Sequence, residues 1–248
     1  MRIENKDFWE REDIIYSQDK TATHTSGYEV YLYEKAKKYF KDKGMTVNKA
    51  KVFGCGTGRE FHGLLKHIPI TKILGTDISE NMIKKGIQNV KDWGMDGIVD
   101  LKVEDASKFK GEENSFELVT LMNCMLTYVN KREDRYSIFK VANTILKEEG
   151  CLIGAVHNQV GTPQKTTYFF LRRLFKPFLK SEPGNRVTGF YGFDVKGYYF
   201  TKKDLRKHLQ ETGFVTIEIK SLSEYCKEIN VPYNRLKGMN NLIFFATK

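Results

Sequence analysis

The sequence lacks any long apolar run. No stretch approaches the roughly 18 consecutive apolar residues that cross a bilayer, and residues 1–10 are too polar for a secretory signal. We therefore expect a cytoplasmic protein with no transmembrane segment. Internal repeats, low-complexity tracts and Pro- or Ser-rich linkers are also absent, so the 248 residues indicate one domain, 1–248.

Disulfide and metal patterns are absent as well. The cysteines are widely spaced and include no C-x-x-C pair; they are Cys55, Cys124, Cys151 and Cys226. This spacing indicates reduced thiols rather than disulfides or metal ligands. No cluster of His, Asp and Glu has metal-ligand spacing, so we expect no bound metal.

What the sequence has in excess is positive charge. The net charge is +10, with 40% hydrophobic residues and a mean hydropathy of −0.48, values typical of a globular protein. Residues 160–210 contain eleven Lys or Arg and three Asp or Glu, and so carry +8 of the total. Such a segment can attract an anionic substrate, nucleic acid or a membrane surface. A solvated lysine-rich face explains it equally well.

The most informative stretch is a short apolar run that ends in three glycines, Lys-Val-Phe-Gly-Cys-Gly-Thr-Gly-Arg-Glu over 51–60. A strand that turns through Gly54, Gly56 and Gly58 brings its backbone close to a ligand, and the helix that follows offers free N–H groups. The dinucleotide pattern G-x-G-x-x-G requires glycine at Arg59 or Phe61. The loop therefore predicts a cofactor site, and its spacing excludes the nicotinamide fingerprint.

After residue 50, short β-rich runs alternate with helical segments, which predicts a parallel sheet covered on both faces. Right-handed crossovers place the carboxyl ends of parallel strands along one edge. We expect five side chains or turns to meet at this edge, namely Gly54, Asp77, Asp105, Asn123 and His157. A functional site belongs there.

Six segments together resemble the motifs of the class I S-adenosylmethionine (SAM)-dependent methyltransferases, in the order of that family. They are the loop 54–58, Asp77 at 19 residues past the last glycine, the turn 103–106, the strand 116–123, the segment 146–153 and the region 199–214. The resemblance covers about 47–220, most of the chain. It implies an α/β fold of three layers around a Rossmann-like sheet of seven strands, with the last pair antiparallel.

The resemblance also implies SAM as cofactor and S-adenosylhomocysteine as product. The cofactor-binding residues carried over from the family motifs are Gly54, Cys55, Gly56, Thr57, Gly58, Asp77, Ile78, Met82, Asp105, Ala106 and Asn123. Asp77 corresponds to the family's acid on the ribose hydroxyls, Asp105 lies near the adenine, and Asn123 lies near the methionine part. Met82 is either an apolar wall for the adenine or a core methionine. The family usually has an acid two places before the first glycine, and here that place is Val52.

Two residues are candidates for the chemistry. His157 follows the fifth strand and has a pKa range suited to removing a proton from a hydroxyl acceptor. A structural histidine is the other interpretation. Tyr128, five residues past Asn123, is a second candidate through its hydroxyl. An amine acceptor with a free lone pair needs no base.

Residues 1–45 are expected to form an N-terminal helical cap. A helix over 28–43 has apolar residues at helical spacing and Gly44 as its C-terminal cap. The segment before it either closes over the cofactor, with Tyr16 lining the substrate site, or packs as a docked arm.

Residues 158–199 form a long insertion after the fifth strand. Its first half predicts a basic amphipathic helix over 168–180 broken near Pro177, and its second half predicts a hairpin or loop pair. We expect a lid over the acceptor, with Arg172 and Arg173 contributing substrate-binding charge at its mouth. A helix that contacts a membrane surface or a partner is the alternative.

These features predict methyl transfer from SAM to a nitrogen or oxygen of a small-molecule acceptor that is anionic or partly apolar. The alternative is a transfer-RNA or other RNA methyltransferase, or an RNA-binding module, that uses the basic segment 160–210. Against it, the fourth strand ends in Asn-Cys-Met-Leu over 123–126 rather than in the N-P-P-Y or D-P-P-Y motif usual in enzymes that methylate base amino groups.

Overall fold

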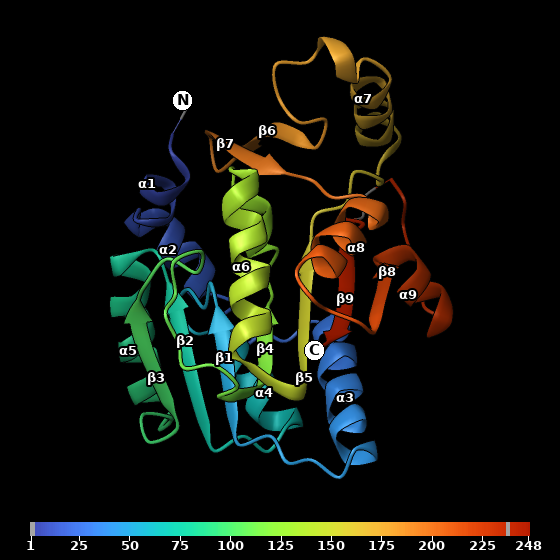
Figure 1. The fold of residues 1–248 in the computed structure, drawn as a ribbon. Coiled ribbons are helices and arrows are strands. Elements are labelled where there is room, and N and C mark those ends of the chain that lie inside the picture. Colours follow the sequence, from blue (N-terminus) through green and yellow to red (C-terminus); the bar gives the residue numbers. More distant parts are fainter. Residues whose placement is uncertain (1–2, 237–238) are drawn as a thin grey trace.

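The computed structural model describes residues 3–236 and 239–248, and its centre is a seven-stranded sheet in the order β3-β2-β1-β4-β5-β9-β8 (Figure 1). Strands β1 to β5 are parallel, and β9 runs antiparallel to both its neighbours. The bounds are Lys49–Phe53 (β1), Lys72–Asp77 (β2), Val99–Val103 (β3), Phe116–Leu121 (β4), Leu146–Val156 (β5), Ile217–Ser221 (β8) and Leu242–Thr247 (β9). This confirms the predicted Rossmann-like fold.

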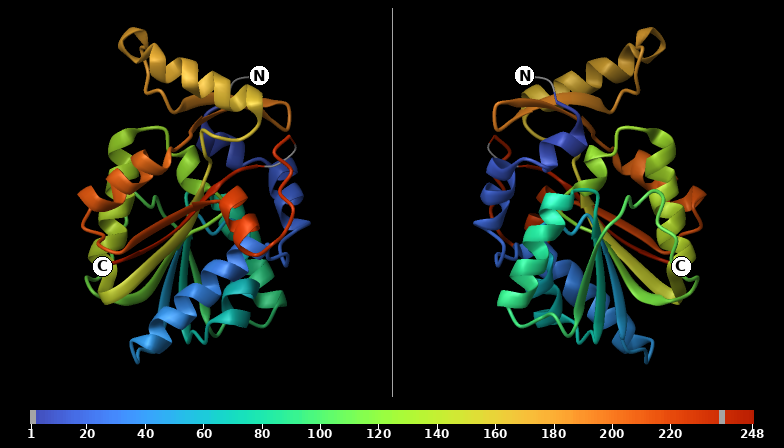
Figure 2. Two further views of the ribbon diagram at one scale, coloured as in Figure 1. Left: turned by 90° about the vertical axis from the view of Figure 1, so that its right-hand side faces the viewer. Right: turned by 90° about the vertical axis from the view of Figure 1, so that its left-hand side faces the viewer.

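Helices cover both faces of the sheet, as the two side views show (Figure 2). Helices α3 (Gly27–Asp42), α4 (Glu60–His67) and α5 (Glu80–Asp92) pack their apolar residues on one face. Helices α6 (Arg132–Ile145) and α8 (Lys202–Glu211) pack on the other. Every residue of β4 is buried, as expected for a central parallel strand.

Local sequence signals explain where α5 begins and ends. The Ser79 hydroxyl accepts a hydrogen bond from the Met82 N–H at 3.0 Å and so caps its amino end. Gly94 follows the helix in a left-handed conformation, with φ of +67°. The first turn of α5 is thereby fixed beside the glycine loop.

The amino-terminal helices α1 (Asn5–Trp9) and α2 (Glu12–Asp19) lie at the carboxyl edge of the sheet. They pack against a two-stranded hairpin from the insertion, β6 (Asn185–Phe190) and β7 (Phe193–Tyr198). The Phe8 ring lies 5.5 Å from the Phe190 ring and 6.1 Å from the Phe193 ring, centroid to centroid. Segments far apart in the sequence therefore close the same edge together.

The first half of the insertion forms α7 (Pro163–Leu174) and a short 3-10 turn, η2 (Lys176–Phe178). Pro177 lies in this turn, so the chain leaves the helical path close to the predicted break. The helix itself begins earlier than its amphipathic pattern suggested, because Thr162 caps it and Pro163 takes the first helical position. None of the described helices is long and apolar enough to cross a membrane.

Candidate functional site

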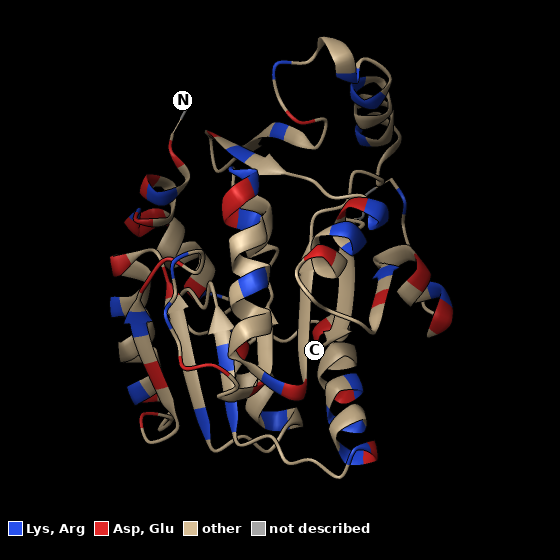
Figure 3. Ribbon diagram, in the orientation of Figure 1, with Lys and Arg blue, Asp and Glu red and all other residues tan. Residues whose placement is uncertain are grey.

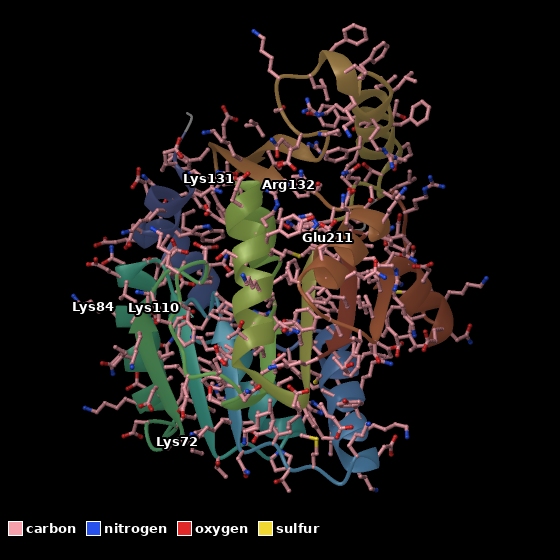
Figure 4. The ribbon with its side chains drawn as sticks, viewed as in Figure 1. Lys72, Lys84, Lys110, Lys131, Arg132 and Glu211 are labelled. Atoms are coloured by element: carbon pink, nitrogen blue, oxygen red, sulfur yellow. The ribbon has the colours of Figure 1, made fainter. Side chains whose placement is uncertain are left out.

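A cavity of about 360 Å³ lies where β1, β2 and β4 end. Its floor is the glycine loop after β1, and its walls include Asp77 from β2 and Asn123 after β4. Two further lining residues are Trp9 of α1 and Lys131, which lies at the start of α6. Figure 4 labels Lys131 at that end of α6. The volume suits a small-molecule site.

The glycine loop turns sharply beneath this cavity. Gly54, Gly56 and Gly58 have φ angles of +66°, +52° and +94°, a region that residues with a Cβ rarely adopt. A Cβ on Gly54 would lie 2.7 Å from Cγ of Met125. Gly54 and Gly56 line the cavity together with Cys55 and Thr57, whereas Gly58 lies outside it. The loop therefore offers backbone rather than side chains to a ligand.

Asp77 ties the glycine loop to the end of β2. Its Oδ2 accepts the Gly56 N–H at 2.9 Å and its Oδ1 accepts the Ser79 N–H at 3.0 Å. Burial raises the pKa of this carboxyl, and the two N–H donors offset part of that rise. Ile78 and Met82 continue the same wall of the cavity. A carboxylate fixed at this point can accept hydrogen bonds from a pair of neighbouring hydroxyls.

The turn after β3 forms the next wall. Asp105 and Ala106 line the cavity, as does Glu104, which the sequence motifs did not single out. Asp105 holds the turn, because its Oδ1 accepts both the N–H and the hydroxyl of Ser107 at 2.9 and 2.8 Å. Its other carboxylate oxygen lies 3.7 Å from Lys108 Nζ and can also accept a hydrogen bond from a ligand amine.

Arg59 is a cavity residue that the sequence motifs did not identify. Its guanidinium is held by the Glu29 carboxylate and by the carbonyl oxygen of His24, and it donates a hydrogen bond to Asn123 Oδ1. Asn123 and Cys124 both adopt positive φ, at 54° and 57°. The only signal for this network in the sequence is that Arg59 directly follows the last glycine.

Comparisons with known proteins agree with this geometry. Residues 52–150 match the family described as the methyltransferase domain. The chain is 26% identical over 186 residues to a demethylmenaquinone methyltransferase of Geobacillus kaustophilus, covering 73% of this chain and 76% of that protein. These matches support a class I SAM-dependent methyltransferase, the family that the sequence motifs resemble.

Solved structures show the same fold for the methyltransferase. A SAM-dependent methyltransferase of Methanosarcina mazei superposes with a TM-score of 0.61 at 19% identity, covering 82% of this chain and 92% of that chain. Phosphoethanolamine N-methyltransferase 2 of Haemonchus contortus, solved with SAM, superposes with a TM-score of 0.66 at 17% identity. It covers 98% of this chain, which spans 59% of that longer chain.

The methyltransferase has a buried acid, Glu60, near Val52. Val52 occupies the position, two places before the first glycine, where the family usually has an acid. Val52 pairs with Thr120 on β4, and Thr120 lies beside the carboxyl of Glu60 from α4. Glu60 is 4% exposed, and burial raises the pKa of its carboxyl to about 8, which the Thr120 hydroxyl offsets only in part. Glu60, the first residue of α4, thus supplies a buried acid directly after the glycine loop, whereas β1 has Val52 in place of an acid.

The amino-terminal segment contributes different residues from the one predicted. Asn5, Lys6, Trp9 and Gln18 line the cavity. Asn5 Nδ2 donates to the carbonyl oxygen of Tyr128 at 2.5 Å, and the Trp9 and Tyr128 rings meet edge to face at 5.3 Å. Tyr16 is 66% exposed and lies outside the cavity. The methyltransferase therefore presents α1, rather than Tyr16, to a bound ligand.

His157 and Tyr128 meet at the end of β5. Tyr128 lines the cavity, and the His157 ring lies behind it with a centroid distance of 6.1 Å. His157 Nδ1 lies 2.8 Å from Asn241 Oδ1. Because this oxygen only accepts, Nδ1 carries the proton and Nε2 keeps a free lone pair.

Both side chains are neutral at pH 7. Burial lowers the pKa of His157 below its ordinary value, although the hydrogen bond that its Nδ1–H donates to Asn241 Oδ1 raises it in part. Burial also raises the pKa of the Tyr128 hydroxyl well above its ordinary value, so this group is a hydrogen-bond donor. The pair can therefore accept one proton at His157 and donate one hydrogen bond from Tyr128.

The basic residues near this end of β5 differ from those predicted. Arg172 donates to the carbonyl oxygens of Pro183 and Glu182 at 3.1 and 3.0 Å and so holds the insertion itself. Arg173 is exposed, and neither arginine lines the cavity. Lys165 and Arg186 do not line it either, but Lys165 Nζ and the Arg186 guanidinium both lie 5.8 Å from the Tyr199 ring centroid, and Tyr199 stacks on His157.

Lys165 and Arg186 are two cations that lie beside the same ring, that of Tyr199. Within residues 3–236 and 239–248, neither side chain makes an ion pair or a hydrogen bond to a carboxylate. Burial lowers the pKa of Lys165, and the charge of Arg186 lowers it further. Among the described residues, no group of three or more His, Cys, Asp or Glu could hold a metal ion.

Proposed function

We propose that the enzyme transfers the methyl group of SAM to a nitrogen or oxygen of a small-molecule acceptor at the end of β5. The observation that carries this proposal is the neutral His157, whose Nε2 is free and whose ring packs behind the cavity residue Tyr128. A neutral imidazole with a free ring nitrogen can act as a general base for an acceptor that lies within hydrogen-bond reach of it.

Different residues of the cavity would bind different parts of SAM. SAM supplies a methyl group activated by the positive charge on its sulfur. The backbone of Gly54 and Gly56 would lie against the nucleoside, Asp77 would accept hydrogen bonds from the two ribose hydroxyls, and Asp105 would accept one from the adenine amine. Arg59 beside Asn123 supplies a cation for the methionine carboxylate.

The protein's main task in this reaction is alignment. Holding the acceptor atom, methyl group and sulfur on one line can lower the barrier by roughly 7 to 11 kcal/mol in favourable intramolecular models. His157 Nε2 takes the proton of a hydroxyl acceptor, and an amine acceptor attacks with its own lone pair. The Tyr128 hydroxyl orients the acceptor, because it remains protonated at neutral pH.

An anionic group on the acceptor fits the basic pair beside Tyr199. Among the described residues no carboxylate pairs with Lys165 or Arg186, so a phosphate or carboxylate of the acceptor would relieve their mutual repulsion. A second structure of the Haemonchus contortus enzyme contains phosphomonomethylethanolamine and S-adenosylhomocysteine. That acceptor belongs to that protein, but it has the combination of amine and anion that these residues suit.

A second candidate is methyl transfer to a ring carbon of a quinol. The names of two curated relatives, 26% and 24% identical, refer to demethylmenaquinone and to ubiquinone or menaquinone C-methylation. A quinol also has to lose a phenolic proton before its ring carbon attacks, so His157 would have the same task. The mass and fragmentation of the product separate this candidate from N- or O-methylation.

The RNA alternative finds less support in the placement of the basic residues. Several cations of segment 160–210 are paired with acids, namely Lys196 with Glu4, Lys202 with Glu224 and Lys207 with Glu211. They do not form one stripe along which a phosphate backbone could run.

Incubation with SAM carrying a deuterated methyl group tests the proposal. The purified enzyme is supplied in parallel with a metabolite extract below about 1 kDa and with transfer RNA, and the label is followed by mass spectrometry. We expect labelled products only in the small-molecule fraction, with the label on nitrogen or oxygen. Label in RNA nucleosides alone would contradict the proposal, and label on a ring carbon would favour the quinol candidate.

A further inference from the structure

The outer end of the insertion exposes a continuous set of large apolar side chains. These are Phe170, Leu171, Leu174, Phe175 and Phe178, which are 45–83% exposed. The sequence predicted that the insertion would form a lid over the acceptor, which would place an apolar face of its helix inward. The structure instead buries the opposite side of α7 through Phe169, whose ring lies 5.2 Å from that of Tyr199.

The same stretch is basic throughout. Residues 158–181 contain five Lys or Arg and no Asp or Glu. Arg173, Lys176 and Lys180 are exposed next to the apolar side chains, and in the described part of the chain no acid pairs with them. Figure 3 shows Lys and Arg on α7 and the turn after it, with the nearest acid further along the loop. We call residues 170–180 the basic apolar tip.

The tip stands clear of the rest of the molecule. In all three ribbon views α7 is the outermost element, beyond the β6–β7 hairpin and at the end of the sheet where the cavity lies. It can therefore meet an extended surface without displacing another element. Its apolar area also has no covering segment among residues 3–236 and 239–248.

We propose that the basic apolar tip docks the enzyme on the surface of an anionic lipid bilayer. Apolar side chains that enter the headgroup region and cations that attract anionic lipids are the two components of interfacial binding, and the tip has both. A second copy of the same face is a poor partner, since its cations would repel. The proposal concerns residues outside the cavity and is independent of which acceptor is methylated.

Vesicle binding of the whole enzyme tests this docking. The probes are vesicles of phosphatidylglycerol and phosphatidylcholine at 3:7 and vesicles of phosphatidylcholine alone, and bound protein is measured by flotation. One variant carries Leu174→Ser, Phe175→Ser and Phe178→Ser, and the second carries Arg173→Glu, Lys176→Glu and Lys180→Glu. All six residues are exposed, so both variants should fold and bind SAM as the wild type does.

We expect binding to the anionic vesicles and little to the neutral ones. The charge variant should bind at least about a hundredfold more weakly, because each lost cation near an anionic surface costs about a factor of five and each added Glu is repelled as well. The apolar variant should bind at least about tenfold more weakly. The matched control Lys66→Glu, Lys84→Glu, Lys91→Glu makes the same charge change on α4 and α5 and should bind normally; Figure 4 labels Lys84 on α5, away from the tip.

Three results would overturn the inference. The first is no binding to anionic vesicles at low salt. The second is an apolar variant that binds as the wild type does, which would show that vesicle binding depends on charge alone. The third is a dimer in light scattering that the apolar variant converts to a monomer, which would make the tip a contact between copies of the chain.

Discussion

Replacing the buried acid beneath the glycine loop should stabilise the enzyme in a pH-dependent way. Burial of Glu60 raises the pKa of its carboxyl from 4.5 to about 8, so folding at neutral pH requires this group to take up a proton. Gln has the same shape and no charge to neutralise. We therefore expect Glu60→Gln to be more stable than the wild type at pH 7.

The size of the effect follows from the two pKa values. At pH 7 the unfolded carboxyl is ionised, and the difference between pH 7 and 4.5 at 1.36 kcal/mol per unit gives about 3 kcal/mol. For an acid whose pKa is raised by folding, the wild type has its full stability below pH 4.5 and loses it progressively as the pH rises to about 8. The gain from Gln should be near zero at pH 4.5 and largest above pH 8.

Urea unfolding at pH 5, 7 and 8.5, followed by circular dichroism, measures this gain. A change of about 3 kcal/mol corresponds to roughly 6 to 12 °C in Tm for a chain of this size. Glu113→Gln, at an exposed site, is the matched control and should change the free energy of unfolding little at any pH. A gain that is the same at all three pH values, or a loss at pH 8.5, would refute the reasoning.

Two further predictions concern the proposed chemistry. His157→Asn should lower kcat by about 10² to 10⁴ for a hydroxyl acceptor while SAM affinity is unchanged. In the pH profile of kcat/KM of the wild type, the fall in activity at low pH should have its midpoint below pH 6.5, because burial lowers the pKa of His157. A midpoint above pH 7 would contradict this. Lys165→Met and Arg186→Met should each raise the acceptor KM by about 10- to 100-fold with little change in kcat, as expected for lost charged hydrogen bonds. Arg173→Met is their control, and an equal effect there would remove the basic pair from the acceptor site.

The sheet was predictable because its signals are local. The glycine turn, the acid that ends β2 and the Ser79 cap each lie within a few residues of the element they define. Parallel pairing then brings the carboxyl ends of the strands together without knowledge of any side-chain contact. The order of seven strands follows from the same rules and the family resemblance.

The remaining parts of the site depend on packing between distant segments. Arg59 meets Glu29 and Asn123 only after α3 docks beside α4, and no sequence spacing shows this. The amphipathic pattern of α7 shows that it has two faces, but not which of them packs inward. The structure buries Phe169 alone of its large apolar residues, because that side meets Tyr199.

Calorimetric titration of SAM into the wild type and Asp77→Ala tests the assignment of the cavity most directly. The wild type should bind one SAM, and the variant should bind it at least about 2 kcal/mol more weakly, because the ribose loses two hydrogen bonds to a carboxylate. Asp96→Ala, at an exposed turn, should bind SAM normally. An Asp77→Ala protein that is folded and binds SAM with unchanged affinity would contradict the account.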